Sequence, residues 1–310
     1  MDNTAPSDAD KARLADLASA KTLEDLVGLT NETSAHEAYF AAKSEWRALT
    51  DKVLPPADTG DGFPADSIDL DGHTINIHGI THTDTQAERE FVREHVSSYT
   101  DAGAFVYCEQ GIRSMYFDDF HRVCEMDDYR WALNRCGELD CDSHLDTTHE
   151  VDTLLEDLNS VTDDFRTALF SLVESGSDLV GEQASQTLGD VATSYLTRHS
   201  DLGIGRDYTS FSLSRRASKD PTYLGALQRY YRTAFLPQPV EREWLRLHDP
   251  ELEITTHARN ERMADYVVHH NEEATQVHVI VGAAHQPGVI YYLRQYQTGE
   301  RTGDDFELLH

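Results

Sequence analysis

Two apolar segments far apart in the chain end in the same pattern, Gly-x-x-His, and each runs directly into a predicted helix. The first pattern is Gly79–His82 and the second is Gly282–His285. Short apolar segments bounded by turn residues predict buried strands, and a helix after a strand returns the chain so that the next strand lies parallel. A third such strand, residues 104–108, follows a helix predicted over residues 86–99. We therefore predict an α/β (α+β) fold, in which a central mixed β-sheet with parallel core strands is flanked by helices.

The strand that ends at Gly79–His82 is also the second strand of a predicted hairpin. Apolar residues alternate with polar ones on both sides of Asp71-Gly72, with Ile68 before the pair and Ile75 after it. An Asp-Gly pair between alternating segments is typical of a two-residue primed turn. The sheet should therefore contain one antiparallel pair beside its parallel strands.

Outside the strands the chain is predicted to be mainly helical. The segments with helical spacing of apolar residues are 9–26, 35–53, 179–198, 222–236 and 257–270. The segment 54–62 is rich in proline and glycine and cannot continue a helix. We place an acidic helical N-terminal extension at residues 1–60 and an α/β domain at residues 61–310, with a large helical insert at about residues 115–250.

The charge of the chain narrows the classes of function. The 310 residues include 56 acidic and 26 basic side chains, a formal net charge of -30, and only five lysines. This composition is typical of proteins from halophilic archaea, in whose cytoplasm molar salt screens the self-repulsion. Disorder is the alternative for a highly charged chain, but three tryptophans, 14 tyrosines and 11 phenylalanines favour a folded protein.

The same charge argues against nucleic acid as a partner, since phosphate binding needs clustered lysine and arginine. No apolar run approaches the roughly 20 residues that span a bilayer. The first residues have neither the basic start nor the apolar core of a signal peptide. We therefore expect a cytoplasmic protein without a membrane span.

The strand ends supply a candidate metal site. In open α/β sheets, ligands bind at the carboxyl edge of the strands, where His82, Glu109 and His285 directly follow the three predicted strands. Two imidazoles and one carboxylate suit a divalent ion with open positions for water or substrate. A single Gly-x-x-His carries little weight in a chain with 16 histidines, and an isolated loop histidine is more often solvated. The recurrence of the pattern after two strands favours the metal site.

At these residues the sequence resembles the TraB family, also called PrgY/GumN, which includes the Tiki metalloproteases. The resemblance rests on the two Gly-x-x-His patterns, on Glu109 after the second core strand, and on Arg259-Asn260 followed by Met263 before the last strand. It covers roughly residues 68–120 and 255–295. In the second pattern alanine occupies a position where glycine is common in the family.

The resemblance implies a metal-dependent hydrolase that acts on peptides or a small molecule, with His82, Glu109 and His285 around manganese, cobalt or zinc. Glu109 is either a ligand or a general base, and Arg113 or Arg259 is expected to stabilise negative charge on the tetrahedral oxygen. For Arg113, an ion pair with the acidic surface is an alternative of equal weight to this role. The alternative is a non-catalytic protein that binds and sequesters a peptide signal, as the pheromone-shutdown relatives suggest. A third interpretation makes the helical insert an interaction module; a homo-oligomer is compatible with each of them.

A second group of metal-ligand residues lies within the predicted helical insert. Its members are His121, Cys124, Cys136, Cys141 and His144, with His149 close behind. Thiolates and imidazoles at such spacings can hold a structural zinc ion. The group contains no paired Cys-x-x-Cys, so ordinary cysteines in a reducing cytoplasm are the alternative. The fourth cysteine, Cys108, is expected to be a small buried residue of the core.

Overall fold

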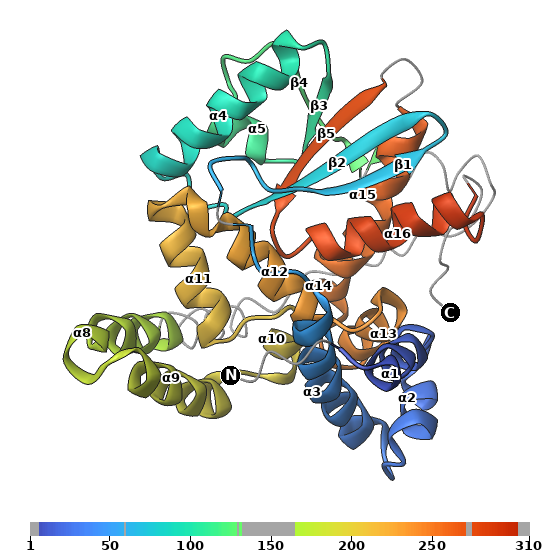
Figure 1. Ribbon diagram of the computed structural model, residues 1–310, viewed down its shortest axis with the longest axis vertical. Helices are drawn as coiled ribbons and strands as arrows, with labels where there is room; N and C mark the ends of the chain where they lie inside the picture. Colours follow the sequence, from blue (N-terminus) through green and yellow to red (C-terminus); the bar gives the residue numbers. More distant parts are fainter. Residues whose placement is uncertain (1–5, 59, 129, 132–164, 271–274, 303–310) are drawn as a thin grey trace.

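The computed structural model of the protein describes residues 6–58, 60–128, 130–131, 165–270 and 275–302. A five-stranded sheet packs between helices, and a further group of helices lies below it in Figure 1. The strands are β1 (Asp66–Leu70), β2 (His73–Ile80), β3 (Phe105–Cys108), β4 (Val123–Glu125) and β5 (Gln276–Gly282). The helices nearest the sheet are α4 (Gln86–Asp101), α5 (Ile112–Tyr116), α11 (Tyr208–Lys219), α12 (Leu224–Ala234), α15 (His257–His269) and α16 (Gln286–Thr298).

The sheet is mixed, with parallel strands in its centre, as the sequence predicts. Its order is β1-β2-β5-β3-β4; β1 is antiparallel to β2, and all other neighbours are parallel. The antiparallel pair is joined through Asp71 and Gly72, whose φ angles of 51° and 89° give the expected primed turn. The central strand, β5, is therefore flanked by the two other strands that carry candidate site residues at their ends.

Both faces of the sheet are covered. On one face, alternate residues of β5 such as Val277 and Val279 pack with Met263 of α15 and Leu293 of α16. On the other face, a second apolar cluster joins β3 and the end of β5 to α4, α11 and α12. Burial on both faces explains why β5 is mostly apolar, at Val277 and at Val279 to Val281, as is typical of the centre of a parallel sheet.

The N-terminal residues form three helices, α1 (Asp8–Ala18), α2 (Leu23–Thr30) and α3 (Ala35–Val53). The segment 9–26, expected to be helical throughout, is divided because Thr22 and Asp25 form a capping box that starts α2. The apolar faces of these helices share a cluster with α13 (Gln238–His248), which includes the buried Trp244. The N-terminal helices therefore pack on the region predicted as the insert.

The predicted insert is mainly helical in its described part. Besides α11 to α13 it contains α8 (Ser177–Val180), α9 (Glu182–Leu196), α10 (His199–Gly203), the 3-10 turn η2 (Pro221–Tyr223) and α14 (Pro250–Thr255). The helix expected over 179–198 is divided at Gly181, whose φ is 86°. Strand β4 also lies in this region and pairs with β3, so the insert is not purely helical.

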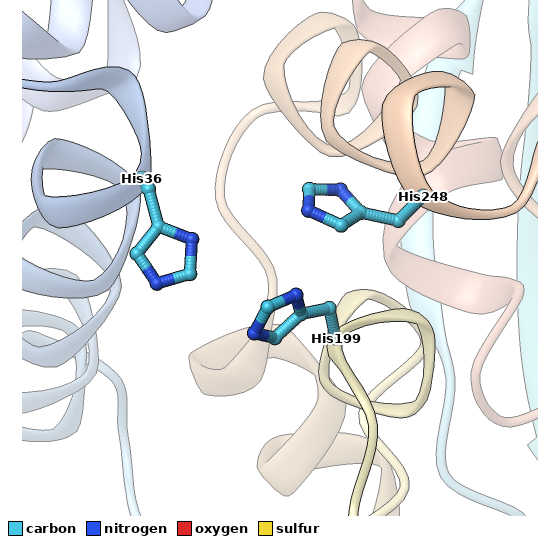
Figure 2. A group of neighbouring side chains, drawn as sticks. All are labelled: His36, His199 and His248. Atoms are coloured by element: carbon cyan, nitrogen blue, oxygen red, sulfur yellow. The ribbon is translucent and has the colours of Figure 1, made fainter.

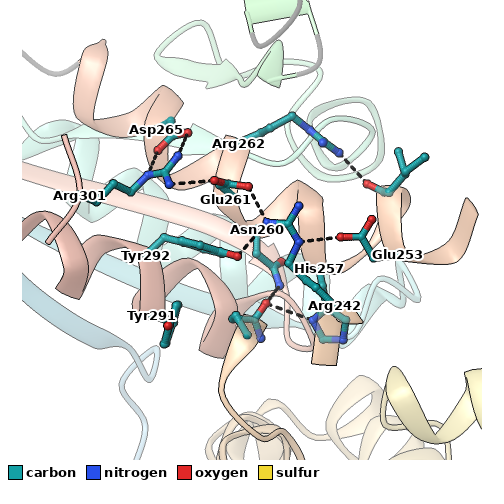
Figure 3. Close-up of polar contacts among 12 residues, drawn as sticks. Arg242, Glu253, His257, Asn260, Glu261, Arg262, Asp265, Tyr291, Tyr292 and Arg301 are labelled. Atoms are coloured by element: carbon teal, nitrogen blue, oxygen red, sulfur yellow. Dashed lines mark hydrogen bonds and ion pairs between the residues drawn. The ribbon is translucent and has the colours of Figure 1, made fainter. Parts of the chain in front are cut away.

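Helix α15, which carries two residues of the candidate site, is held by a network of buried charges (Figure 3). Arg242 of α13 contacts the carboxylates of Glu253 and Glu261, each at 2.6 Å. Near the C-terminus Arg301 forms a two-point ion pair with Asp265, at 2.8 and 2.7 Å. Because fully buried ion pairs are costly to separate, this network fixes α15 against α13, α14 and the end of the described chain.

None of the helices in the described part of the chain is long and apolar enough to cross a membrane.

Candidate functional site

The carboxyl ends of β2, β5 and β3 lie side by side, which brings the three predicted ligands to one place. Adjacent backbone bonds hold these ends together: Ala283 N–H donates to Ile80 O at 2.8 Å, and Glu109 N–H donates to Ile280 O at 2.9 Å. The Nε2 atoms of His82 and His285 lie 3.4 and 3.5 Å from the two carboxylate oxygens of Glu109. The two imidazoles therefore face one buried carboxylate between them.

Glu109 is held as a carboxylate by its surroundings. It is 3% exposed, and it accepts hydrogen bonds from Gly282 N–H at 2.8 Å and from the Arg259 guanidinium at 2.9 Å. Burial alone raises the pKa of Glu109, but the effects of His285, His82 and Arg259 outweigh burial and hold this pKa well below its usual range. The site therefore presents a negative charge to whatever binds between the histidines.

The two glycines of the repeated pattern lie where other atoms come too close for a larger side chain. A Cβ atom on Gly282 would lie 3.1 Å from Cδ2 of His82 and 3.5 Å from Cδ2 of His285, so the absence of a side chain leaves room for both rings. A Cβ atom on Gly79 would lie 2.8 Å from the Cα atom of Ala283, which is closer than such atoms approach. Glycine at these positions therefore allows the strand ends to meet and the imidazoles to share one space.

His82 sits in a strained turn at the end of β2. Its φ angle is 64°, in the left-handed region that residues other than glycine adopt rarely. The preceding residue is fixed: Thr81 donates both its backbone N–H and its hydroxyl to the buried carboxylate of Glu88, each at 2.7 Å. Such strain persists only where neighbouring contacts impose it and is concentrated at functional sites. His82 is 36% exposed and is thereby open to a ligand from solvent.

His285 is oriented by a chain of amide groups. Asn260 Nδ2 donates to Gln238 Oε1 at 2.9 Å, which turns Asn260 Oδ1 towards Nδ1 of His285 at 2.7 Å. Nδ1 therefore carries a proton, and Nε2 is the nitrogen that faces Glu109. Burial lowers the pKa of His285, while the carboxylate of Glu109 acts in the opposite direction. A hydrogen bond at the second nitrogen is the usual arrangement for a metal-binding histidine.

Arg259 connects Glu109 to a second carboxylate that sequence reasoning missed. Its Nε donates to Asp128 at 3.2 Å, while its NH1 group donates to Glu109. Asp128 is fully buried, and burial raises its pKa against the opposing effect of Arg259. The guanidinium is therefore shared between two carboxylates, and this places Arg259 at the inner wall of the site.

Arg113, the other arginine proposed from the sequence, is not brought to this place. Its Nε donates to the backbone oxygen of Val123 at 3.1 Å and so ties α5 to β4. The direction of the short helix α5 determines where the Arg113 side chain lies, and this direction could not be inferred from its spacing from Glu109. The expected role of Arg113 at the tetrahedral oxygen therefore has no support in its position.

A pocket of about 280 Å³ opens in front of the site. It is lined by the polar residues His82, Glu109 and His285 and by the aromatic residues Tyr231 and Phe235. A larger groove of about 870 Å³ runs between α3 and α12 and holds none of the predicted site residues. Arg206 lines both. The chemistry of the side chains favours the smaller pocket as the binding site.

The second predicted metal group lies mostly outside the described residues. Cys136, Cys141, His144 and His149 fall in the undescribed segment 132–164. The two remaining members, His121 and Cys124, flank the start of β4 and are exposed. Cys108, by contrast, is buried in β3 as expected, and burial raises the pKa of its thiol.

A second group of potential metal ligands lies away from the sheet edge. Within the described ranges, one group of three histidine, cysteine or acidic side chains has ligand atoms that all lie within 4.8 Å of one another, namely His36, His199 and His248. The ligand atoms of His82, Glu109 and His285 at the sheet edge do not all lie this close together, although each imidazole lies within 3.5 Å of the carboxylate.

Comparison of the chain with protein-family models, with curated proteins and with solved structures finds no match.

Proposed function

We propose that the protein is a metal-dependent hydrolase whose site is formed by His82, Glu109 and His285, with a peptide or another amide as its substrate. The observation that carries the proposal is the pair of imidazole Nε2 atoms, from two separate strand ends, that face the two oxygens of one buried carboxylate at 3.4 and 3.5 Å. Two nitrogen donors and one oxygen donor suit manganese, cobalt or zinc.

The surroundings of the donors support this interpretation. Asn260 holds His285 in the tautomer that leaves Nε2 free to donate its lone pair. Gly282 N–H and Arg259 hold Glu109 ionised and in position. A divalent ion, when bound, would lower the pKa of a water molecule that it binds and would polarise the carbonyl of an amide. Arg259, beside Glu109, is placed to stabilise negative charge that develops on the substrate.

The pocket indicates the kind of substrate. Tyr231 and Phe235 offer an aromatic surface for an apolar side chain. Arg206 lines both this pocket and the larger groove. A short peptide fits this arrangement, because one residue can fill the small pocket while the rest of the chain follows the groove.

A second function, binding without turnover, is favoured by one specific observation. Both oxygens of Glu109 are already engaged, one by Gly282 N–H and the other by Arg259. A carboxylate held in this way is a weak general base. The protein would then bind and sequester a peptide in the same pocket.

Metal analysis of two variants tests the site. We expect His82→Ala and His285→Ala, purified in molar KCl and dialysed without chelator, each to lose one equivalent of bound manganese, cobalt or zinc. His270→Ala is the matched control, because His270 is exposed and its Nδ1 bonds to the backbone oxygen of Tyr266. Retention of the full metal content in both site variants would refute the assignment.

Turnover then separates the two functions. A library of short peptides incubated with the metal-loaded protein should yield cleavage products, and Glu109→Gln should abolish them. Tight peptide binding without cleavage, measured by calorimetry on the same samples, would favour sequestration over hydrolysis.

A further inference from the structure

Three histidines outside the sheet-edge site point towards one another (Figure 2). They are His36 in the first turn of α3, His199 at the start of α10 and His248 at the end of α13. Their ligand nitrogens all lie within 4.8 Å of one another, and the ring of His199 is 5.0 Å from each of the other two rings, centre to centre. The three side chains come from helices far apart in the sequence, so the fold itself assembles the group.

The buried Trp244 orients the ring of His248 and holds the backbone of His199. Its backbone oxygen lies 2.7 Å from Nδ1 of His248, so Nδ1 carries the proton and Nε2 keeps a lone pair. Its indole ring packs against the His248 ring at 4.0 Å, and its Nε1 donates to the backbone oxygen of His199 at 3.3 Å. Fixing the second nitrogen and the ring plane is how proteins prepare histidine for a metal ion.

The charge of the group also favours a cation. Neutral imidazole is the form that binds metal. Burial, His248 and His36 together lower the pKa of His199, in the direction that leaves its lone pair available. The chain around the group has a net charge of -30, which raises the local concentration of divalent cations.

We propose that His36, His199 and His248 bind one transition-metal ion of the zinc class through three imidazole nitrogens, with the remaining position open to water. Three nitrogen ligands with an open fourth position form a common zinc site, and imidazole selects such ions against magnesium and calcium. The ion fastens α3, and with it the N-terminal helices, to α10 and α13. All three side chains are exposed, so the ion exchanges directly with solvent and a chelator removes it.

The proposal is tested with Zn²⁺ alone as the probe, in molar KCl with excess Mg²⁺ to occupy surface carboxylates. The parent protein is His82→Ala, so that binding at the sheet edge does not contribute. We expect one equivalent of bound zinc and a rise in Tm of roughly 5 °C when free zinc is 100 times the Kd, both reversed by EDTA. Adding His199→Ala or His248→Ala to the parent should abolish both the bound equivalent of zinc and the rise in Tm. Adding His270→Ala should leave zinc binding and the rise in Tm unchanged.

Hydrogen exchange distinguishes a clip between helices from loose surface binding. Zinc should slow amide exchange in the first turns of α3, because the ion ties His36 to two other helices. Circular dichroism of the metal-free variants checks that they fold, and His36→Gln serves if an alanine variant does not. The proposal is overturned if the parent binds no zinc in the presence of Mg²⁺, if the two histidine variants keep the bound equivalent, or if zinc leaves exchange in α3 unchanged.

Discussion

Replacing Gly282 by alanine displaces one proposed ligand without removing a polar atom. The new Cβ would lie 3.1 Å from Cδ2 and 3.3 Å from Nε2 of His82, so that ring has to move outward by about 0.3 Å to reach ordinary contact. His82 is 36% exposed and has room to move. Since metal–ligand distances tolerate only about 0.2 Å, this displacement is enough to weaken binding at the sheet edge.

The expected magnitudes separate affinity from stability. A displacement beyond this tolerance should lower metal affinity at least about tenfold, or roughly 1.4 kcal/mol. The φ angle of Gly282 is not positive, so alanine fits the backbone there and gains about 0.4–1 kcal/mol from the unfolded chain. The displaced ring costs a similar amount, about 0.5–1.5 kcal/mol. The free energy of unfolding should therefore change by less than about 1 kcal/mol.

The neighbouring glycine of the other pattern provides the contrast. In Gly79→Ala the new Cβ would lie 2.8 Å from the Cα atom of Ala283, which is backbone and cannot move aside. This variant should lose about 1–3 kcal/mol of folding stability. Calorimetric titration with Mn²⁺ or Zn²⁺ and guanidinium denaturation measure the two quantities. Unchanged metal affinity in Gly282→Ala would refute the placement of His82 at the ion.

Two further predictions concern stability. Arg242→Leu should cost about 3–5 kcal/mol of unfolding free energy, because it leaves two buried carboxylates, one of them Glu253, with one cation fewer. The surface variant Arg93→Leu should cost about 1 kcal/mol or less; equal losses in denaturant titrations would contradict the argument. Burial lowers the pKa of His78 to about 3 and that of His278 to about 4. As the pH falls below about 6.5 the unfolded chain therefore takes up protons before the folded one, and by pH 5 the unfolding free energy should decrease by about 2 kcal/mol for each histidine. In His78→Leu about half of this pH dependence should disappear, and an unchanged dependence would show the reasoning to be wrong.

Local patterns predicted four of the five strands, because β1, β2, β3 and β5 are each recognisable from their own residues. The apolar residues of β5 and the turn at Asp71-Gly72 act over a few positions, and both appear as expected. The parallel order follows from the helices between the strands. Strand β4 has only three residues, two of them exposed, so no periodicity predicts it.

Contacts between side chains from distant segments of the chain could not be predicted from the sequence. The geometric part of the site prediction, that three strand ends place His82, Glu109 and His285 together, depended only on the parallel order of the strands. The partners that orient these side chains come from elsewhere: Gln238 from α13 and Asp128 from the segment after β4. Nothing in their local sequence distinguishes them from the many other polar residues of the chain.

The arginines inside the protein respond to salt differently from the acidic exterior. Arg242 and its partner Glu253 are wholly inaccessible to solvent, so dissolved ions cannot enter between them and weaken their attraction. Repulsion among the outer carboxylates, in contrast, grows as salt is diluted. Dilution should therefore first loosen the periphery, while α15, with Arg259 bonded to Glu109 and Asn260 bonded to His285, keeps its place until the whole molecule unfolds.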